Sequence, residues 1–305
     1  MYRYVGKRLW MALLTIFIVA SVTFFAMNLV PGGPFTSEKA LSPEAQAALE
    51  EKYGLDKPLF EQYVRYLKNV LSGDFGESIK QRGRSVLSII MSKFPVSATL
   101  GGLAVVFALA IGIPLGILAA TKRGTWIDYT ILIAATGGIA IPSFVVCSLL
   151  LYFFGVKFQM LPTYGLENFW NYVMPVTALA FYPAAYVTRL IRNSMMDVLG
   201  QDYMRTAKAK GVSPRMLLFK HALRNAILPV VTYVGPLLAY TITGSFIVEK
   251  IFTIPGLGGE FVGAVTGRDY PVIMGTTIFL ATLLILMNVL VDIVYKWIDP
   301  RIKLH

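Results

Sequence analysis

The 305-residue sequence contains one cysteine, Cys147, and only two histidines, His221 and His305. A single cysteine excludes an internal disulfide framework and any CxxC metal or redox site. Two histidines and one cysteine also provide no metal-spaced cluster and no plausible catalytic triad. The Gly-x-x-x-x-Gly-Lys-Ser/Thr loop of nucleotide-binding proteins is missing as well. We therefore expect that this chain is not an enzyme and binds no metal or other cofactor itself.

Charge is also scarce, because only 15% of the residues are charged and 56% are hydrophobic. That composition lies outside the range of ordinary soluble domains and indicates that lipid is the solvent for much of the chain. Lysine and arginine outnumber aspartate and glutamate by 28 to 17, which gives a net charge of +11. Such an excess fits nucleic-acid binding, a membrane surface or membrane orientation, and the positions of the basic residues decide among them.

Six charge-free stretches are each long enough for the roughly 20 helical residues that cross a bilayer core. They cover residues 9–30, 94–120, 129–156, 168–188, 225–248 and 270–291. Because lipid offers no partner to backbone amides and carbonyls, each stretch is expected to be α-helical. The fold class predicted from the sequence is an all-α integral membrane protein with six transmembrane helices.

The basic residues predict how these helices are oriented. Arg3, Lys7 and Arg8 precede the first apolar run, which is too long for a signal peptide and has no A-x-A cleavage site, so we expect an uncleaved helix. With a cytoplasmic N-terminus, the inner segments carry most lysines and arginines and the short outer loops carry few. This positive-inside asymmetry predicts that both termini are cytoplasmic. Membrane orientation therefore explains the net charge better than nucleic-acid binding does.

The predicted helices and their orientation divide the chain into three regions. Residues 1–30 form the cytoplasmic N-terminus and the first helix, residues 31–93 an external helical segment, and residues 94–305 a core of helices two to six with a cytoplasmic loop at 189–224. In the external segment, apolar residues at helical spacing predict one amphipathic helix, bounded by start signals and a glycine turn. These residues are Leu59, Phe60, Tyr63, Val64, Leu67, Val70 and Leu71, with Asp56 and Pro58 before them and Gly73 and Gly76 after them.

Prolines inside the apolar stretches interrupt helical hydrogen bonding, and such breaks are tolerated where neighbouring helices or a cavity absorb them. Pro142, Pro183, Pro229 and Pro236 are therefore candidate hinges around a pathway, whereas Gly112 and Gly116 have the GxxxG spacing of close helix packing. The run that contains Pro255, Gly256 and Gly258 forms either an outer gate or a plain loop. The nearby charged residues Glu249, Glu260, Arg268 and Asp269 are alternative contacts for a docking partner.

The cytoplasmic loop carries the pattern on which a family resemblance depends. Arg205-Thr206-Ala207 is followed after three residues by Gly211, and His221-Ala222-Leu223-Arg224 comes later. This pattern resembles the coupling loop of ATP-binding-cassette (ABC) importer permeases, whose consensus is Glu-Ala-Ala, three residues, Gly, nine residues and Ile-x-Leu-Pro. Ala207, Gly211 and Leu223 match strictly, while Arg205 and Arg224 replace the Glu and the Pro. The form Arg-Thr-Ala-Lys-Ala-Lys-Gly is similar to the variant of the oligopeptide and dipeptide branch.

Further pieces of sequence extend this resemblance over almost the whole chain. In chain order they are Pro31-Gly32, Tyr53-Gly54-Leu55-Asp56, the turn from Gly73 to Ser78, Ile141-Pro142-Ser143-Phe144, Gly244-Ser245, Pro255-Gly256-Leu257-Gly258 and Asp299-Pro300-Arg301. Their joint order is similar to that of the first of the two permeases in oligopeptide systems, the OppB type.

The resemblance implies a role and a set of partners. It implies that a coupling helix enters a cleft in an ATPase subunit, with the contributing residues Arg205, Thr206, Ala207, Lys208, Ala209, Lys210, Gly211, His221 and Leu223. The alternative is a basic amphipathic helix that lies on anionic headgroups. The implied partners are a second homologous permease, two nucleotide-binding ATPase subunits that use ATP and Mg, an extracytoplasmic peptide-binding protein and membrane lipid, with no nucleic acid. The implied location is a bacterial cell membrane, and the implied mechanism is alternating access.

Other functions remain open at this point. Within the family, a dipeptide, glutathione, nickel or an oligosaccharide is an alternative to an oligopeptide as substrate, because one fold carries different cargoes. The alternative from another class is a secondary transporter driven by an ion gradient. Such a protein is expected to have inverted repeats and ionisable residues near the membrane midplane. The six charge-free stretches show neither feature.

Overall fold

The computed structural model describes residues 2–29 and 43–298, and in this part of the chain the only β-structure is an isolated bridge between Glu77 and Ser85. Pro31-Gly32 and Asp299-Pro300-Arg301 lie outside the described residues. The helices are α1 (Tyr2–Leu29), α2 (Pro43–Tyr53), α3 (Leu59–Leu71), α4 (Val86–Thr121), α5 (Trp126–Ala140), α6 (Ser143–Leu150), π-helix η1 (Leu151–Lys157), α7 (Phe169–Leu199), α8 (Asp202–Ala209), α9 (Pro214–Met216), π-helix η2 (Leu217–Ala222), α10 (Leu223–Ala226), α11 (Leu228–Ile242), α12 (Phe246–Ile251), α13 (Leu257–Gly267) and α14 (Tyr270–Ile298).

Four stretches of helix in the described residues are long and apolar enough to cross a membrane. They are Trp10–Leu29, Val86–Thr121, Leu228–Ile251 and Tyr270–Val291, and the bent pair of α5 with α6 and η1 adds a fifth if it forms one span. The helix α7 contains 31 residues and is long enough, but it is not among them because no part of it is sufficiently apolar. Length and composition therefore support four or five of the six predicted spans.

The third predicted span is not one straight helix. The chain bends by 106° between Trp126–Ala140 and Ser143–Lys157. Ile141, at the break, has an extended backbone with ψ of 124°, and Pro142 caps the next helix. A proline has no amide to donate and disfavours helical geometry in the residue before it, so the helix ends at Ala140. The interruption predicted at Pro142 is thus a sharp bend between two helices.

Helices α4 and α7 pack closely along their length. A Cβ atom added to Gly112 would lie 2.8 Å from the backbone oxygen of Ala184, and one added to Gly116 would lie 2.7 Å from that of Thr188. Only glycine leaves room for such an approach of two helix backbones. The predicted packing role of these two glycines is confirmed.

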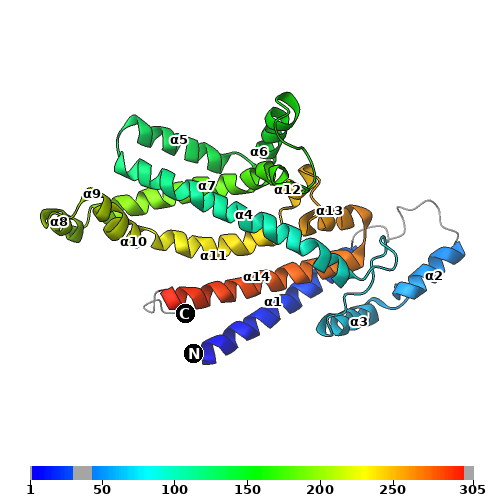
Figure 1. Ribbon diagram of the computed structural model, residues 1–305. Coiled ribbons are helices and arrows are strands. Elements are labelled where there is room, and N and C mark those ends of the chain that lie inside the picture. The colour runs from blue at the N-terminus through cyan, green and yellow to red at the C-terminus, as the bar shows by residue number, and fades with distance from the viewer. Residues whose placement is uncertain (1, 30–42, 299–305) are drawn as a thin grey trace.

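Figure 1 shows α4, α5, α7 and α11 running side by side, with α14 and α1 next to them. The chain direction alternates through α1, α4, α5, α7, α11 and α14. The start of α1 and the end of α14 lie at the same end of the bundle as α8 and α10, while α2, α12 and α13 lie at the other end. The segment between α1 and α4, which contains α2 and α3, and the segment between α7 and α11, which contains α8 to α10, are therefore at opposite ends of the bundle.

The segment between α1 and α4 contains the predicted amphipathic helix. This helix, α3, begins directly after Pro58, and the turn that follows it has Gly73 at φ of +75° and Gly76 at φ of +77°. The buried carboxylate of Asp269, just before α14, accepts hydrogen bonds from the amides of Ile79 at 3.1 Å and Lys80 at 3.2 Å and from the hydroxyl of Ser78. This contact fixes the segment to the start of α14.

Candidate functional site

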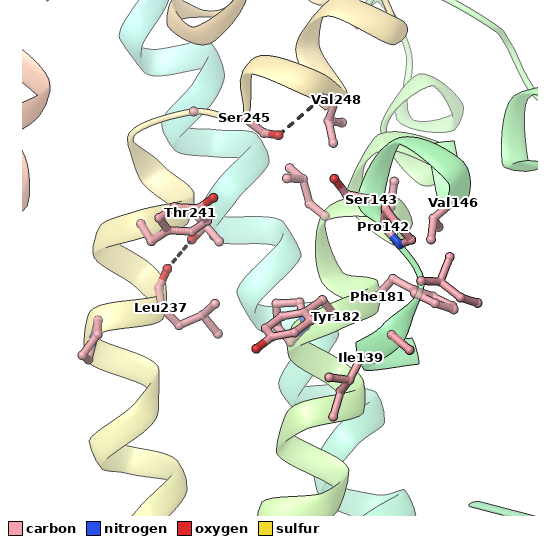
Figure 2. A pocket seen from close by; sticks show the side chains of 18 of the residues that line it. Ile139, Pro142, Ser143, Val146, Phe181, Tyr182, Leu237, Thr241, Ser245 and Val248 are labelled. Carbon is pink, nitrogen blue, oxygen red and sulfur yellow. Dashed lines mark hydrogen bonds between the residues drawn. The ribbon is translucent and has the colours of Figure 1, made fainter. Parts of the chain in front are cut away.

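A cavity of about 560 Å³ lies where the long helices are interrupted. Its walls are the bend between α5 and α6, the middle of α7, the second half of α11 and the first residues of α12 (Figure 2). Three of the predicted hinge residues, Pro142, Pro183 and Pro236, line it from three different elements. Pro183 and Pro236 each remove one backbone amide donor inside α7 and α11, and Pro142 precedes α6 at the sharp bend, so three interruptions of helical hydrogen bonding face one common space.

The side chains that line the cavity are mostly apolar, and several of them carry hydroxyl groups. The hydroxyl-bearing residues are Ser143, Tyr182, Tyr233, Tyr240, Thr241 and Ser245, and none of the residues that line the cavity carries a charge. The ring of Tyr182 projects from α7 toward α11, as does Leu237 from α11 toward α7 (Figure 2). Such a wall accepts a ligand through aromatic contact and uncharged hydrogen bonds, and it contains no carboxylate or amine to relay protons or hold ions.

Tyrosines form a continuous group on one side of this cavity. The rings of Tyr182 and Tyr186 are 6.3 Å apart and nearly parallel, and the rings of Tyr186 and Tyr233 are 4.5 Å apart. Tyr240 is 74% exposed, farther along α11. Sequence reasoning missed this group, although the spacing of four between Tyr182 and Tyr186 places both on one face of a helix.

The other candidate gate residues lie elsewhere. Pro229 is in the first turn of α11 and does not line the cavity. Gly256 and Gly258 surround the carboxylate of Glu249, and a Cβ on Gly256 would collide with that carboxylate. Pro255 directly precedes Gly256 in the loop between α12 and α13, and these two helices lie at the other end of the molecule from α8.

Glu249 is 1% exposed and organises the loop before α13. Its Oε1 accepts a hydrogen bond from the hydroxyl of Ser97 on α4 at 2.7 Å, and its Oε2 accepts one from the amide of Gly259 at 2.9 Å. The Ser97 oxygen in turn accepts from the amide of Leu257 at 2.8 Å. This network connects α12, the glycine-rich loop and α4, and no local sequence pattern predicts it because Ser97 and Glu249 are 152 residues apart in the chain.

These contacts correct one sequence prediction. Glu249 and Asp269 were candidate contacts for a docking partner, but both carboxylates are buried and bound to groups of this chain. That prediction is wrong for these two residues. Glu260 is partly exposed and accepts a hydrogen bond from the side chain of Gln81, and Arg268 ends α13 in a left-handed conformation.

The segment with the predicted coupling residues forms α8 and the turn after it. Met204 is buried in a cluster with residues of α7 and of η2 to α11, including Ile191 and Ala226. The side-chain amide of Asn225 donates to the hydroxyl of Tyr203 at 2.9 Å. One side of α8 is therefore held on the ends of the long helices.

The opposite side of α8 is open. Arg205, Thr206, Lys208, Ala209 and Lys210 are exposed, and Ala207 is partly buried. Gly211 follows the helix with φ of +77°, and an added Cβ there would meet no other atom, so backbone conformation and not space selects glycine. His221 and Leu223 lie in η2 and α10, behind α8, and are partly buried.

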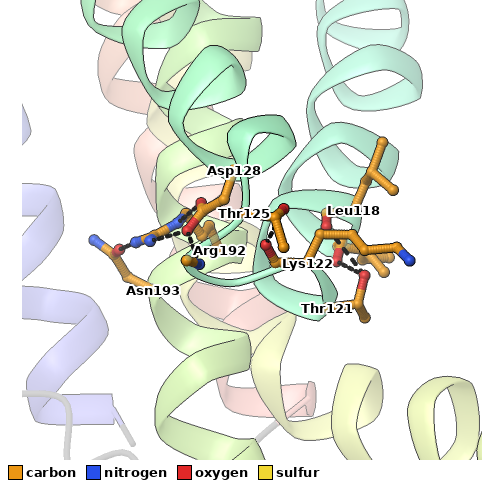
Figure 3. A network of polar contacts seen from close by, with 9 residues as sticks. Leu118, Thr121, Lys122, Thr125, Asp128, Arg192 and Asn193 are labelled. Carbon is orange, nitrogen blue, oxygen red and sulfur yellow. Dashed lines mark hydrogen bonds and ion pairs between the residues drawn. The ribbon is translucent and has the colours of Figure 1, made fainter.

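An ion pair lies at the same end of the bundle as α8 (Figure 3). Arg192 on α7 donates to Asp128 on α5 through Nε at 2.6 Å and Nη2 at 2.9 Å. The amide of Gly124 donates to the same carboxylate at 3.0 Å. The Asp128 side chain is 2% exposed and that of Arg192 14%, so this two-point contact fixes the start of α5 to α7.

Comparison with known proteins connects these features to a family. A family described as binding-protein-dependent transport system inner membrane component matches residues 112–304, and the N-terminal part of such membrane components matches residues 1–101. The chain is 47% identical to the dipeptide transport system permease protein DppB of Bacillus subtilis, over 100% of this chain and 99% of that protein. It is 43% identical to the oligopeptide transport system permease protein OppB of Haemophilus influenzae, over 99% of this chain and 100% of that protein.

A solved structure shares the fold. An inward-facing form of the MetNI methionine ABC transporter contains a chain that superposes with a TM-score of 0.56. The superposition covers 70% of this chain and 97% of that chain, at 17% sequence identity. At this identity the likeness concerns the fold alone.

Proposed function

The chain belongs to the family of binding-protein-dependent transport system inner membrane components, and from this premise we propose that it is a permease subunit of an ABC importer for peptides. The observation that carries the proposal is the similarity to two peptide permeases along the full length of the chain. The protein is a multi-pass component of a bacterial cell membrane. It holds part of the pathway and performs no ATP hydrolysis.

The proposed topology has six passages with both termini in the cytoplasm. The passages are α1, α4, α5 with α6, α7, α11 with α12, and α14. The alternating chain direction in Figure 1 supports this count, and the basic residues around α8 support its cytoplasmic side. The segment 31–93 is then external, and α8 is the contact for the ATPases.

The proposed pathway contains the proline-lined cavity. A peptide in extended form presents amides and carbonyls, and the hydroxyl groups of Tyr182 and Tyr240 match such groups without demanding a particular side chain. A second, homologous permease closes the other side of the pathway. The bend at Pro142 and the prolines inside α7 and α11, Pro183 and Pro236, are the positions where the helices change angle as the cavity opens to one side of the membrane and then the other.

The proposed coupling runs through α8. Its exposed side, with Arg205, Thr206 and Lys208, enters a cleft of an ATPase subunit that binds ATP and Mg, and Met204 transmits the movement to α7 and α11. Two such ATPases serve the two permeases. A peptide-binding protein delivers cargo at the opposite face. The relatives include a dipeptide and an oligopeptide permease, so we assign peptides as the cargo class, and mass spectrometry of the ligand on the binding protein measures their length.

Substitution in α8 tests the coupling proposal. Ala207→Glu places a charge where the helix would enter a protein cleft, and desolvation of that charge is costly. We expect peptide uptake and co-purification of the ATPases to fall at least about tenfold, which corresponds to about 1.4 kcal/mol of binding free energy. The matched control Gln201→Glu adds the same charge at the exposed start of α8 and should keep both near wild type. Wild-type uptake and co-purification in Ala207→Glu would refute the coupling role.

A further inference from the structure

The external helix α3 has an apolar edge that no other part of the described chain covers. Phe60 is 77% exposed, Leu71 86% and Val64 46%, and no residue of α3 is buried. Full burial of one such side chain contributes roughly 1.5–3 kcal/mol, so their joint exposure to water would be unfavourable. We therefore expect the apolar edge of α3 to lie against another apolar surface.

The other edge of α3 shows where the helix sits. Tyr63 and Tyr66 pack on Phe24, with ring centroids 5.3 Å and 5.4 Å apart, and Tyr63 also packs on Phe25 at 5.1 Å. The hydroxyl of Tyr63 is 2.6 Å from the hydroxyl of Ser21. These contacts place α3 beside the last turns of α1, within the apolar stretch Trp10–Leu29.

The surface of α1 at this level is itself open and apolar. Val22 is 62% exposed, Phe25 42% and Leu29 81%. In a membrane-spanning helix these residues face lipid. Phe25 touches Tyr63 of α3, so the open edge of α3 continues the lipid-facing surface of α1.

From this continuity, and on the external placement of α3 that the proposed function gives, we propose that α3 lies in the outer leaflet at the boundary between lipid and water. Phe60, Val64 and Leu71 insert among the lipid chains. The polar side carries Lys68, and its acidic Glu61 is already paired with Lys57 at 3.0 Å, so the Lys68 ammonium is available to headgroup phosphates. Arg65 on the same side donates to the backbone oxygen of Tyr53 at 2.7 Å.

Lipid contact gives the external segment a second anchor. The chain continues from α3 through the Gly73 and Gly76 turn to Ser78, which is bound to Asp269. One end of the segment is thus fixed to the start of α14 and the other to the bilayer beside α1. The segment keeps its position over the membrane while the long helices move.

Spin labels on single cysteines test this placement in the assembled importer in lipid nanodiscs. The native Cys147 is replaced by alanine, and labels are attached in the variants Phe60→Cys, Val64→Cys and Leu71→Cys, with Glu61→Cys as the matched control on the polar side. Each labelled importer is first checked for peptide uptake. At the three apolar positions we expect collisions with dissolved oxygen to exceed collisions with a water-soluble nickel chelate several-fold, and at Glu61 we expect the reverse.

Two results would overturn the lipid placement. Frequent nickel collisions at Phe60 and Leu71 would show that the edge faces water. Few collisions with either reagent there would show that protein covers it, either the partner permease or the peptide-binding protein. Labelling of Glu61→Cys by an impermeant thiol reagent outside sealed cells separates the inference from the topology, because labelling only from the inside would contradict the topology instead.

Discussion

At the scale of single residues, the buried carboxylate of Glu249 shows how an acidic side chain becomes structural. It accepts from Ser97 and Gly259, and glycines at positions 244, 256 and 258 leave the space it needs. A charged group that is satisfied in this way stabilises the loop, whereas the same group without its donors would destabilise it. The loop before α13 therefore depends on one side chain from α12.

Substitution of Glu249 by glutamine should destabilise the protein. Glutamine keeps one acceptor oxygen and places an amide donor where the other oxygen accepted, which leaves a buried donor of Gly259 or Ser97 unsatisfied. We expect the free energy of unfolding to fall by about 1–3 kcal/mol. Thermal unfolding in mild detergent measures this, with the exposed Glu61→Gln as the control, expected to change by less than about 0.5 kcal/mol. Equal effects of the two variants would contradict the structural role of Glu249.

The ion pair of Asp128 and Arg192 should behave as a unit. Removing one partner leaves a charge in a largely buried place, so Asp128→Ala and Arg192→Ala should each destabilise the protein more than half as much as the double variant. A double-mutant cycle on thermal unfolding should give a coupling free energy of about 0.5–3 kcal/mol. Additive effects of the two substitutions would show that the contact contributes nothing between α5 and α7.

Residue identity predicted some of these roles and not others. The glycines of α4 and the prolines around the cavity follow from intrinsic backbone properties, which are the same in any sequence context. The roles of Glu249 and Asp128 depend on partners 152 and 64 residues away in the chain. No local sequence pattern identifies partners so distant in the chain. A charged residue next to an apolar stretch is therefore equally consistent with an exposed position on the surface.

At the scale of elements, the apolar runs predict where long helices lie but not how they bend. The predicted helix α3 is found at Leu59–Leu71, and α4 and α14 contain their predicted spans. A proline marks a break, whereas the angle of 106° at Pro142 depends on what α6 packs against, including α7 and α12. The predicted span 168–188 corresponds to the first part of α7, which continues beyond it through charged residues to Leu199.

The close approach of α4 and α7 should fail when a side chain is inserted. Gly116→Val would place a Cβ 2.7 Å from that of Ile191, and overpacking of this kind typically costs about 1–3 kcal/mol. We expect a reduced yield of folded protein in size-exclusion chromatography. Gly102→Val in the same helix, where an added Cβ meets nothing within 4 Å, is the control and should keep the wild-type yield. Equal yields would contradict the packing of α4 on α7.

At the scale of the whole molecule, the helices place two groups of features at opposite ends. The exposed side of α8 and the Asp128 pair lie at one end, and the loop around Glu249 and the segment between α1 and α4 lie at the other. The proline-lined cavity lies between them, on α7 and α11, which also pack with Met204 of α8. Under the proposed coupling, a movement at α8 reaches the cavity through these two helices. Such a separation of the α8 surface from the cavity is consistent with the proposal that another subunit supplies the energy.

The central claim, that this chain is a passive pathway driven by separate ATPases, is tested most directly by reconstitution. The chain, its partner permease, the two ATPases and the peptide-binding protein are combined in proteoliposomes, and uptake of a labelled peptide is measured with each component omitted in turn. We expect uptake that requires ATP and every component, and we expect neither ATP hydrolysis nor uptake by the chain alone. Peptide uptake by the chain alone, driven by an ion gradient without ATP, would contradict it.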